Sequence, residues 1–234
     1  MHDHLSSLSN DEIQKRTGDE TEKQTASRNN SASAPVTARG EATRQRILDA
    51  AEEVFGESGY YEASVSEITR RAGVAQGTFY IYFPSKREIF VELIEELGRH
   101  LRAATRNAMA GASDRLEAER RGFAAFFDFA AKHRRIYNIV QEAERVVPEA
   151  ARAYYLAISR GYARDLRAAM EAGMIREMPS PEAIAYALMG IGHFVALRWL
   201  IWSQDQQDQQ GQEGQEAVPT LPPEVFETVV DFIT

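Results

Sequence analysis

Hydrogen-bonding side chains are concentrated in one short segment of the chain, residues 73–86. The segment carries an amide, a hydroxyl, two phenols and an ammonium group, which belong to Gln76, Thr78, Tyr80, Tyr82 and Lys86. An amide can bond N6 and N7 of adenine, and a threonine methyl can pack on a thymine methyl. Phenol and ammonium groups suit phosphate oxygens, which set the register of a protein on a duplex. These residue types together indicate contact with duplex DNA.

Each of these residues also has a purely structural interpretation when it is taken singly. Tyr80 and Tyr82 could be core aromatics whose hydroxyls reach the surface, and Lys86 could be a solvated surface lysine. Ser64, at the start of the preceding helix, could be a helix cap alone. The combination of residues, and no single member of it, favours DNA binding.

A helix-turn-helix is predicted over about residues 64–83. Ser64 and Glu67 have the spacing of a capping box, which begins one helix. Gly73 ends that helix, because glycine tolerates a left-handed backbone best. Only a three-residue turn separates it from the next helix, so the two helices must cross at a steep angle.

The second helix of this pair is short, about residues 75–82. Phe79 and Phe83 are one turn apart and can both face the core. Pro84 blocks its continuation, and residues 85–88 form a second capping box that starts a long helix. An earlier helix is predicted from Glu41 onward, with Gly56 and Gly59 ending it.

The rest of the chain divides by composition into a polar arm and a helical body. Residues 1–40 are polar and aperiodic, and we expect a disordered arm. Its Arg28 and Arg39 could touch a minor groove, or the arm could simply be solvated. A domain of residues 41–101 follows, and then a body of residues 102–234 with a mobile, Gln-rich loop at 203–222. No alternating strand pattern is present, and helices are predicted at about 115–132, 134–146, 149–172, 181–203 and 223–233.

Composition limits the classes of function. The 234 residues are 44% hydrophobic, enough for one or two domains with a sizeable core. The chain contains no cysteine, so disulfides and thiolate metal sites are excluded. Its five histidines are mostly far apart in sequence, and we expect no metal site and no cofactor. The N-terminus lacks the pattern of a secretory signal, and we expect a cytoplasmic protein.

The formal net charge of -8 argues mildly against nucleic acid binding, because phosphate neutralisation dominates affinity for DNA. The objection is met locally, since residues 75–85 carry no acidic side chain. We therefore expect salt-sensitive binding with few phosphate contacts per subunit, for which dimerisation compensates.

A known pattern of residue types and spacing matches the chain without a gap from about residue 43 to residue 101. The matching residues are 43–51, Phe55, 59–60, 64–68, 72–74 and 77–86. Over this stretch the chain resembles the DNA-binding domain of the TetR family of bacterial transcriptional regulators. The resemblance implies an all-α fold, in which a three-helix helix-turn-helix domain precedes a helical domain for effector binding and dimerisation.

The resemblance also implies which residues meet DNA. The helix at about 75–82 would enter the major groove as a recognition helix, where Gly77 permits close approach. Lys86 would meet a phosphate at the start of the next helix. The full set of implied contact residues is Thr43, Arg44, Ser64, Ser66, Gln76, Gly77, Thr78, Tyr80, Ile81, Tyr82 and Lys86.

The two last predicted helices are candidates for a dimer interface. Residues 183–202 are apolar nearly all round, which indicates a helix buried on several sides rather than a membrane span. With residues 223–233 this helix could form a four-helix interface whose two-fold symmetry matches a palindromic operator. The alternative is a purely intramolecular core.

Aromatic residues of the body are candidates for an effector pocket. The residues chosen are Phe126, Tyr137, Tyr155, His193, Phe194 and Trp199. Aromatics at helical spacing can equally be plain core. A pocket of this composition would be mostly apolar with few polar groups, which suggests a hydrophobic or aromatic effector.

The predicted function is a homodimeric repressor that a small hydrophobic effector releases from a palindromic DNA operator. The alternative is an activator, or a DNA-binding protein without an effector. An enzyme is not expected, because no Gly-rich phosphate loop follows a strand and no acid–base or nucleophile set is present. Gly190 and Gly192 lie within an apolar helix, which is the wrong context for a dinucleotide-binding turn.

Overall fold

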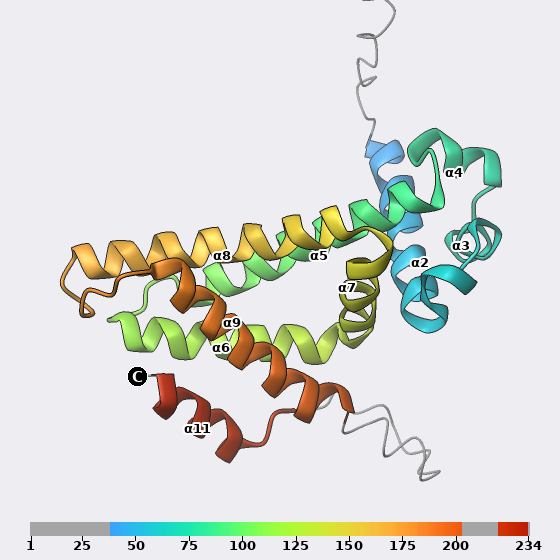
Figure 1. Cartoon of the computed structure of the whole chain (residues 1–234). Helices are drawn as coiled ribbons and strands as arrows, with labels where there is room; N and C mark the ends of the chain where they lie inside the picture. The colour runs from blue at the N-terminus through green and yellow to red at the C-terminus, as the bar shows by residue number, and fades with distance from the viewer. Residues whose placement is uncertain (1–37, 203–219, 234) are drawn as a thin grey trace, which may run out of the picture. The chain divides into compact units, whose positions relative to one another are not determined.

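Helices make up most of the described chain (Figure 1). The computed structural model describes residues 38–202 and 220–233, and no strand occurs among them, so the predicted all-α class is confirmed. In chain order the helices are α2 (Ala38–Glu62), α3 (Val65–Ala72), α4 (Gln76–Tyr82), α5 (Lys86–Met109), α6 (Arg115–Lys132), α7 (Arg134–Val146), α8 (Pro148–Glu171), α9 (Pro181–Ala196), the π-helical turn η1 (Leu197–Ile201) and α11 (Pro223–Ile233).

Two sequence predictions fall mainly on residues that the structure does not describe. Arg28, nearly all of the predicted arm and residues 203–219 of the predicted loop lie outside the described residues. The segment Ala38–Thr43 is described as the helical start of α2 and belongs to a separate unit from the residues that follow it. The first helix therefore begins before Glu41, where the sequence predicted its start.

A first hydrophobic core joins α2, α3, α4 and α5. Phe55, Ile68, Phe79 and Phe90 are almost completely buried in it. Complete burial of one such side chain contributes about 1.5–3 kcal/mol. Since α4 is far too short to be stable alone, the buried rings of Phe79 within it and of Phe83 at its C-cap are what hold it in place.

The ends of these helices follow the sequence signals closely. The Oγ atom of Ser64 accepts a hydrogen bond from the Glu67 N–H at 3.1 Å, and Ser85 does the same for Glu88. Gly73 ends α3 with φ at 65°. The first helix deviates from the prediction, because α2 continues through Gly56 and breaks only at Gly59, where φ is 74°.

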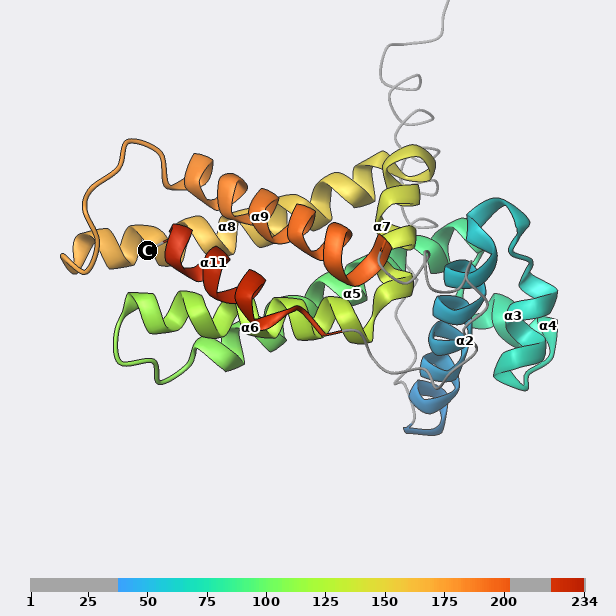
Figure 2. The same ribbon diagram turned by 90° about the horizontal axis from the view of Figure 1, so that it is seen from below.

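The C-terminal half surrounds α5 with further helices. The helix α5 runs without a break past residue 101, where the sequence predicted a domain boundary. Helices α6 and α8 both pack along α5, and α9 packs on α8 (Figures 1 and 2). Phe226 of α11 meets the ring of Phe127 of α6 at a centroid distance of 6.4 Å. This half therefore has a second core, which is formed by α6, α9, η1 and α11.

The predicted continuous helix at 181–203 is wrong in one detail. The helix α9 ends at Ala196, and a π-helical turn continues it to Ile201. The stretch Pro181–Ile201 is long and apolar enough to cross a membrane, a test that core helices of soluble proteins also pass. Two large apolar side chains of this stretch are exposed in the single chain, Tyr186 at 43% and Phe194 at 66%.

Candidate DNA-binding face and effector cavity

One face of α4 is exposed while the opposite face is buried. Gln76, Gly77, Tyr80 and Ile81 are exposed, and the exposed fractions of Tyr80 and Ile81 reach 55% and 77%. These positions are spaced i, i+1, i+4 and i+5, which places them on one side of a helix. The predicted contact residues Thr78 and Tyr82 are half-buried, and Tyr82 packs against the first core. The structure thus brings four of the six predicted positions of α4 onto one free surface.

The start of α3 presents two hydroxyl groups. Ser64 and Ser66 are both exposed, and their Oγ atoms lie 3.0 Å apart in a mutual hydrogen bond. Ser64 also caps α3 through the Glu67 N–H. The predicted cap is confirmed, and a contact with DNA would add a third partner to the Ser64 hydroxyl, which already bonds the Glu67 N–H and the Ser66 hydroxyl.

Lys86 is held by the end of α2. Its ammonium group donates to the carbonyl oxygens of Tyr60, Tyr61 and Ala63 at 2.7, 3.3 and 2.8 Å. The Nζ atom also lies 4.6 Å from the centroid of the Tyr60 ring. A lysine has three N–H donors, and here each has a carbonyl partner. The phosphate contact predicted for Lys86 stays a prediction, and it requires the exchange of at least one of these bonds.

The predicted contacts at the start of α2 are also engaged within the chain. Arg44 forms an ion pair with Glu92, and its guanidinium lies 5.5 Å from the centroid of the Phe83 ring. The hydroxyl of Thr43 donates to the carbonyl oxygen of Arg39 at 3.0 Å. Arg44 therefore packs over the buried ring of Phe83 at the end of α4, whether or not it also contacts DNA.

Ion pairs moderate the charge around the exposed face of α4. Arg70 and Arg71 both bond the Glu67 carboxylate, at 2.7 and 2.8 Å, and this lowers the pKa of Glu67 to about 2. Arg87 is paired with Glu149. Because these flanking cations are neutralised, the candidate face is close to neutral instead of strongly basic.

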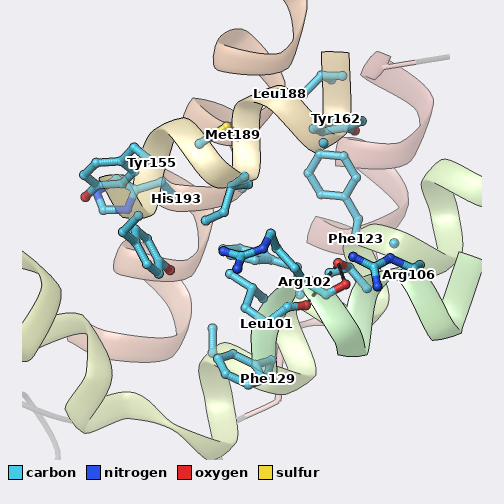
Figure 3. Close-up of a pocket in the computed structure, with 18 of the residues that line it drawn as sticks. Leu101, Arg102, Arg106, Phe123, Phe129, Tyr155, Tyr162, Leu188, Met189 and His193 are labelled. Atoms are coloured by element: carbon cyan, nitrogen blue, oxygen red, sulfur yellow. Dashed lines mark hydrogen bonds between the residues drawn. The ribbon is translucent and has the colours of Figure 1, made fainter. Parts of the chain in front are cut away.

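A mostly apolar cavity of about 210 Å³ lies among α5, α6, α7, α8 and α9 (Figure 3). Four of the six predicted pocket residues line it, namely Phe126, Tyr137, Tyr155 and His193. Phe194 and Trp199 are not among the lining residues. Phe194 follows His193 by one residue, so the helix turns it away from the cavity, and 66% of it is exposed. The ring of Trp199 instead lies under the guanidinium group of Arg198, whose Cζ atom is 5.4 Å from the centroid of that ring.

Burial shifts the pKa values of two polar side chains that line the cavity. The rings of Tyr137 and His193 stack at 5.4 Å with an angle of 19°. Burial lowers the pKa of His193 and raises the pKa of Tyr137, so both side chains are neutral near pH 7. The Tyr155 hydroxyl donates to Glu144 at 3.1 Å.

Charged residues in the cavity were missed by the sequence analysis. Arg102 and Arg106 line it from α5, and Glu119 lines it from α6. Glu119 is paired with Arg115 and accepts a hydrogen bond from the Tyr162 hydroxyl. The i, i+4 spacing of the two lining arginines could have identified a shared face, but not the cavity that this face lines.

Comparisons with known sequences match the N-terminal part of the chain. Residues 47–93 fit the sequence model of bacterial regulatory proteins of the tetR family. The chain is 49% identical over 51 residues to the fatty acid metabolism regulator protein of Bacillus subtilis, a segment that covers 22% of this chain and 26% of that protein. It is 33% identical over 103 residues to the transcriptional activator FasR of Mycolicibacterium smegmatis, covering 44% and 47% respectively. The aligned segments thus span less than half of these curated relatives.

Solved structures are similar over most of the chain. The fatty acid degradation regulator FadR of Bacillus halodurans aligns with a TM-score of 0.66 and 22% identity, over 82% of this chain and 94% of that one. FadR of Bacillus subtilis in complex with stearoyl-CoA aligns with a TM-score of 0.59 and 21% identity, over 81% and 96%. At these identities the likeness establishes the helical fold.

Proposed function

We propose that this chain, whose residues 47–93 match the tetR family of bacterial regulatory proteins, is a homodimeric repressor that a hydrophobic effector releases from its operator. The observation that carries the DNA-binding part is the exposed face of α4, with Gln76, Gly77, Tyr80 and Ile81 on one side and Phe79 buried on the other. A helix that packs on the core through its opposite face can enter a major groove without disturbing that core.

The side chains of α4 divide into two roles in this proposal. Gln76 and Thr78 read base edges, since an amide and a threonine methyl can distinguish bases. Tyr80 and the start of α3 contact phosphates and fix the register. Gly77 has no side chain, so the backbone of the helix can approach the DNA closely. A Cβ atom added at Gly77 would have no other protein atom within 4 Å.

A dimer would cover the apolar surface that α9 and α11 expose. Phe194 is 66% exposed on α9, and Phe232 is 78% exposed on α11. Large apolar side chains that are left exposed are typical of an interface. A two-fold interface between two copies would present two α4 helices to a palindromic site.

The cavity supports a hydrophobic effector. Its lining includes Phe123, Phe126, Leu188 and Met189, which suit an alkyl or aromatic body. Two similar proteins are named for fatty acid metabolism and for a complex with stearoyl-CoA. We therefore assign the effector to the acyl-chain-like hydrophobic compounds.

An activator is the second candidate, since the relative FasR is named as one. The same DNA-binding face and cavity would serve an activator as well as a repressor. Transcription in vitro from a bound promoter, with and without the full chain, separates the two.

Binding of the full chain to the DNA upstream of its own gene tests the proposal. The comparison is with random duplex of equal length at matched salt, because phosphate contacts alone give unspecific binding. We expect a clear preference for the upstream DNA that falls when a hydrophobic effector is added. Equal binding to both duplexes would contradict the proposed function.

A further inference from the structure

Two arginines line the cavity without forming an ion pair among residues 38–202 and 220–233. They are Arg102 and Arg106, which lie one turn apart on α5 and so share one side of that helix. Arg102 is half-buried, whereas Arg106 is exposed. Figure 3 shows Arg106 near Phe123, at the opposite end of the close-up from Tyr155 and His193, with Arg102 between them. Arg106 therefore marks an end of the cavity that reaches solvent.

The other charged groups at the cavity wall are neutralised. Glu119 is paired with Arg115, which is itself almost buried, and the Tyr162 hydroxyl donates to the same carboxylate. Arg164 and Asp165 are bonded to each other at 3.2 Å. The wall therefore carries an excess of two positive charges, which belong to Arg102 and Arg106.

Favourable interactions with the C-terminal end of α5 do not account for Arg102 and Arg106 together. A cation in the last turn of a helix is favourable, and Arg106 lies near the end of α5. However, it is the guanidinium of Arg121 that donates to the carbonyl oxygen of Ala110 beyond this end, at 3.3 Å. Arg102 lies about two turns before the end of α5, beyond the reach of the helix dipole. Arg102 is half-buried at this apolar wall, and a partly buried charge is stabilised when a counter-charge arrives.

We propose that the ligand of this cavity is an anionic amphiphile, whose carboxylate or phosphate group is bound by Arg102 and Arg106. This inference rests on the proposed effector function and specifies the ligand that the cavity takes. A guanidinium group presents a planar fork that matches carboxylate and phosphate oxygens. The two full charges outweigh the partial negative charge at the end of α5, which is about half an elementary charge. The apolar body of the ligand extends from there along Phe123 and Phe126.

Calorimetric titration of the full-length chain with ligands that differ only in the head group tests this proposal. The probes are decanoate, decanol and decylamine. We expect decanoate to bind roughly tenfold more tightly than decanol, since one charged hydrogen bond corresponds to about that factor. Arg102→Gln and Arg106→Gln should each remove most of this preference and leave the affinity for decanol unchanged.

Two further variants provide the controls. Arg99→Gln changes an exposed arginine of α5 that does not line the cavity, and it should leave all three affinities unchanged. Arg102→Lys keeps the charge and should restore part of the preference for decanoate. Thermal unfolding of each variant without ligand separates lost binding from lost folding.

The outcomes distinguish this inference from the function on which it rests. If decanoate and decanol bind equally in the wild type, the anionic head group is wrong and the hydrophobic effector stands. If neither binds, both proposals fail. If decylamine binds most tightly, Glu119 dominates the site and the inference is overturned. Decanoyl-CoA as a fourth probe separates the sources of the anion: tighter binding than decanoate, lost in Arg106→Gln, identifies phosphate, and weaker binding identifies a free carboxylate.

Discussion

The backbone N–H of Tyr60 donates a hydrogen bond of 2.6 Å to the carboxylate of Glu142. The carbonyl oxygen of the same Tyr60 accepts a hydrogen bond from Lys86, at the start of α5. Glu142 belongs to α7, and the same helix supplies Tyr137 and Val140 to the cavity wall. One helix therefore forms part of the cavity and also holds the end of α2 from which the helix-turn-helix follows.

Removal of the hydrogen bond between the Tyr60 N–H and Glu142 should weaken the coupling between effector binding and DNA binding. In Glu142→Ala the Tyr60 N–H loses a charged partner, at a cost of about 1.5–3 kcal/mol in the free energy of unfolding. We expect the effector to change the DNA affinity of this variant less than that of the wild type, because allosteric coupling needs an element that both sites bias. Titration of DNA binding with and without decanoate measures the difference. Glu142→Gln keeps an acceptor oxygen and should retain most of the coupling; identical coupling in all three proteins would exclude this route.

Replacement of Gly77 should have opposite effects on stability and on DNA binding. The added Cβ of Gly77→Ala meets no protein atom within 4 Å, and alanine in a helix is favoured over glycine by about 0.5–1 kcal/mol. The variant should therefore unfold at a higher temperature but bind operator DNA more weakly, because the methyl group meets the groove. Thermal unfolding and DNA titration are measured on the same preparation. A variant that is more stable and binds DNA as well as the wild type would remove Gly77 from the DNA-facing surface.

Lys86 and Gln76 should differ in how their loss affects binding. Lys86→Met removes bonds to three carbonyls and should lower the free energy of unfolding by about 1.5–3 kcal/mol, together with affinity for every DNA sequence. Gln76→Ala changes an exposed residue and should alter base preference without loss of stability. Chemical denaturation and titration with specific and random duplex check both effects. Equal losses on both duplexes for Gln76→Ala would refute its role in reading bases.

Stability at acid pH should depend on Glu67. The paired arginines hold its folded-state pKa at about 2, below the ordinary value of 4.5. A carboxyl group with a lowered pKa stabilises the fold above its unfolded pKa, and this contribution is lost as the pH falls toward the folded pKa. We expect the free energy of unfolding to decline between pH 4.5 and about 2, and to decline less in Glu67→Gln. Parallel pH profiles of the two proteins would show that this ion pair does not contribute.

Charges placed on the uncovered apolar faces should prevent dimerisation. Phe194→Lys and Phe232→Lys put like charges at the proposed interface, and we expect monomers in sedimentation experiments and a large loss of operator affinity. Leu116→Lys is the matched control, because Leu116 is also half exposed but lies on α6. Dimers that persist in both phenylalanine variants would locate the interface elsewhere.

The parts of the molecule that could be predicted from the sequence are those that local signals determine. The helix α4 was predictable because Gly73, Phe79, Phe83 and Pro84 lie within a few residues of one another. The partners of Lys86 were not, since Tyr60 lies 26 positions away in the chain and accepts the hydrogen bond only through its backbone oxygen. Helical spacing identifies a face of a helix, but it does not say what that face meets.

The cavity illustrates the same limit. The aromatic spacing selected Tyr137 and His193, and both side chains line the cavity; their contact with an effector stays a prediction. It also included Phe194, although a step of one residue turns a side chain to a different face. Arg102 was missed because a sequence does not show whether an arginine on a helix has a counter-charge nearby.

Selection of bound duplexes from a random DNA library by the full-length protein tests the central claim most directly. We expect enrichment of a palindrome whose half-sites are separated by about one helical turn or a multiple of it. The double variant Gln76→Ala, Thr78→Ala should select a palindrome changed at the same position of each half-site. Absence of enrichment by the wild type, or an identical palindrome from the double variant, would contradict the account of α4 as the helix that reads DNA.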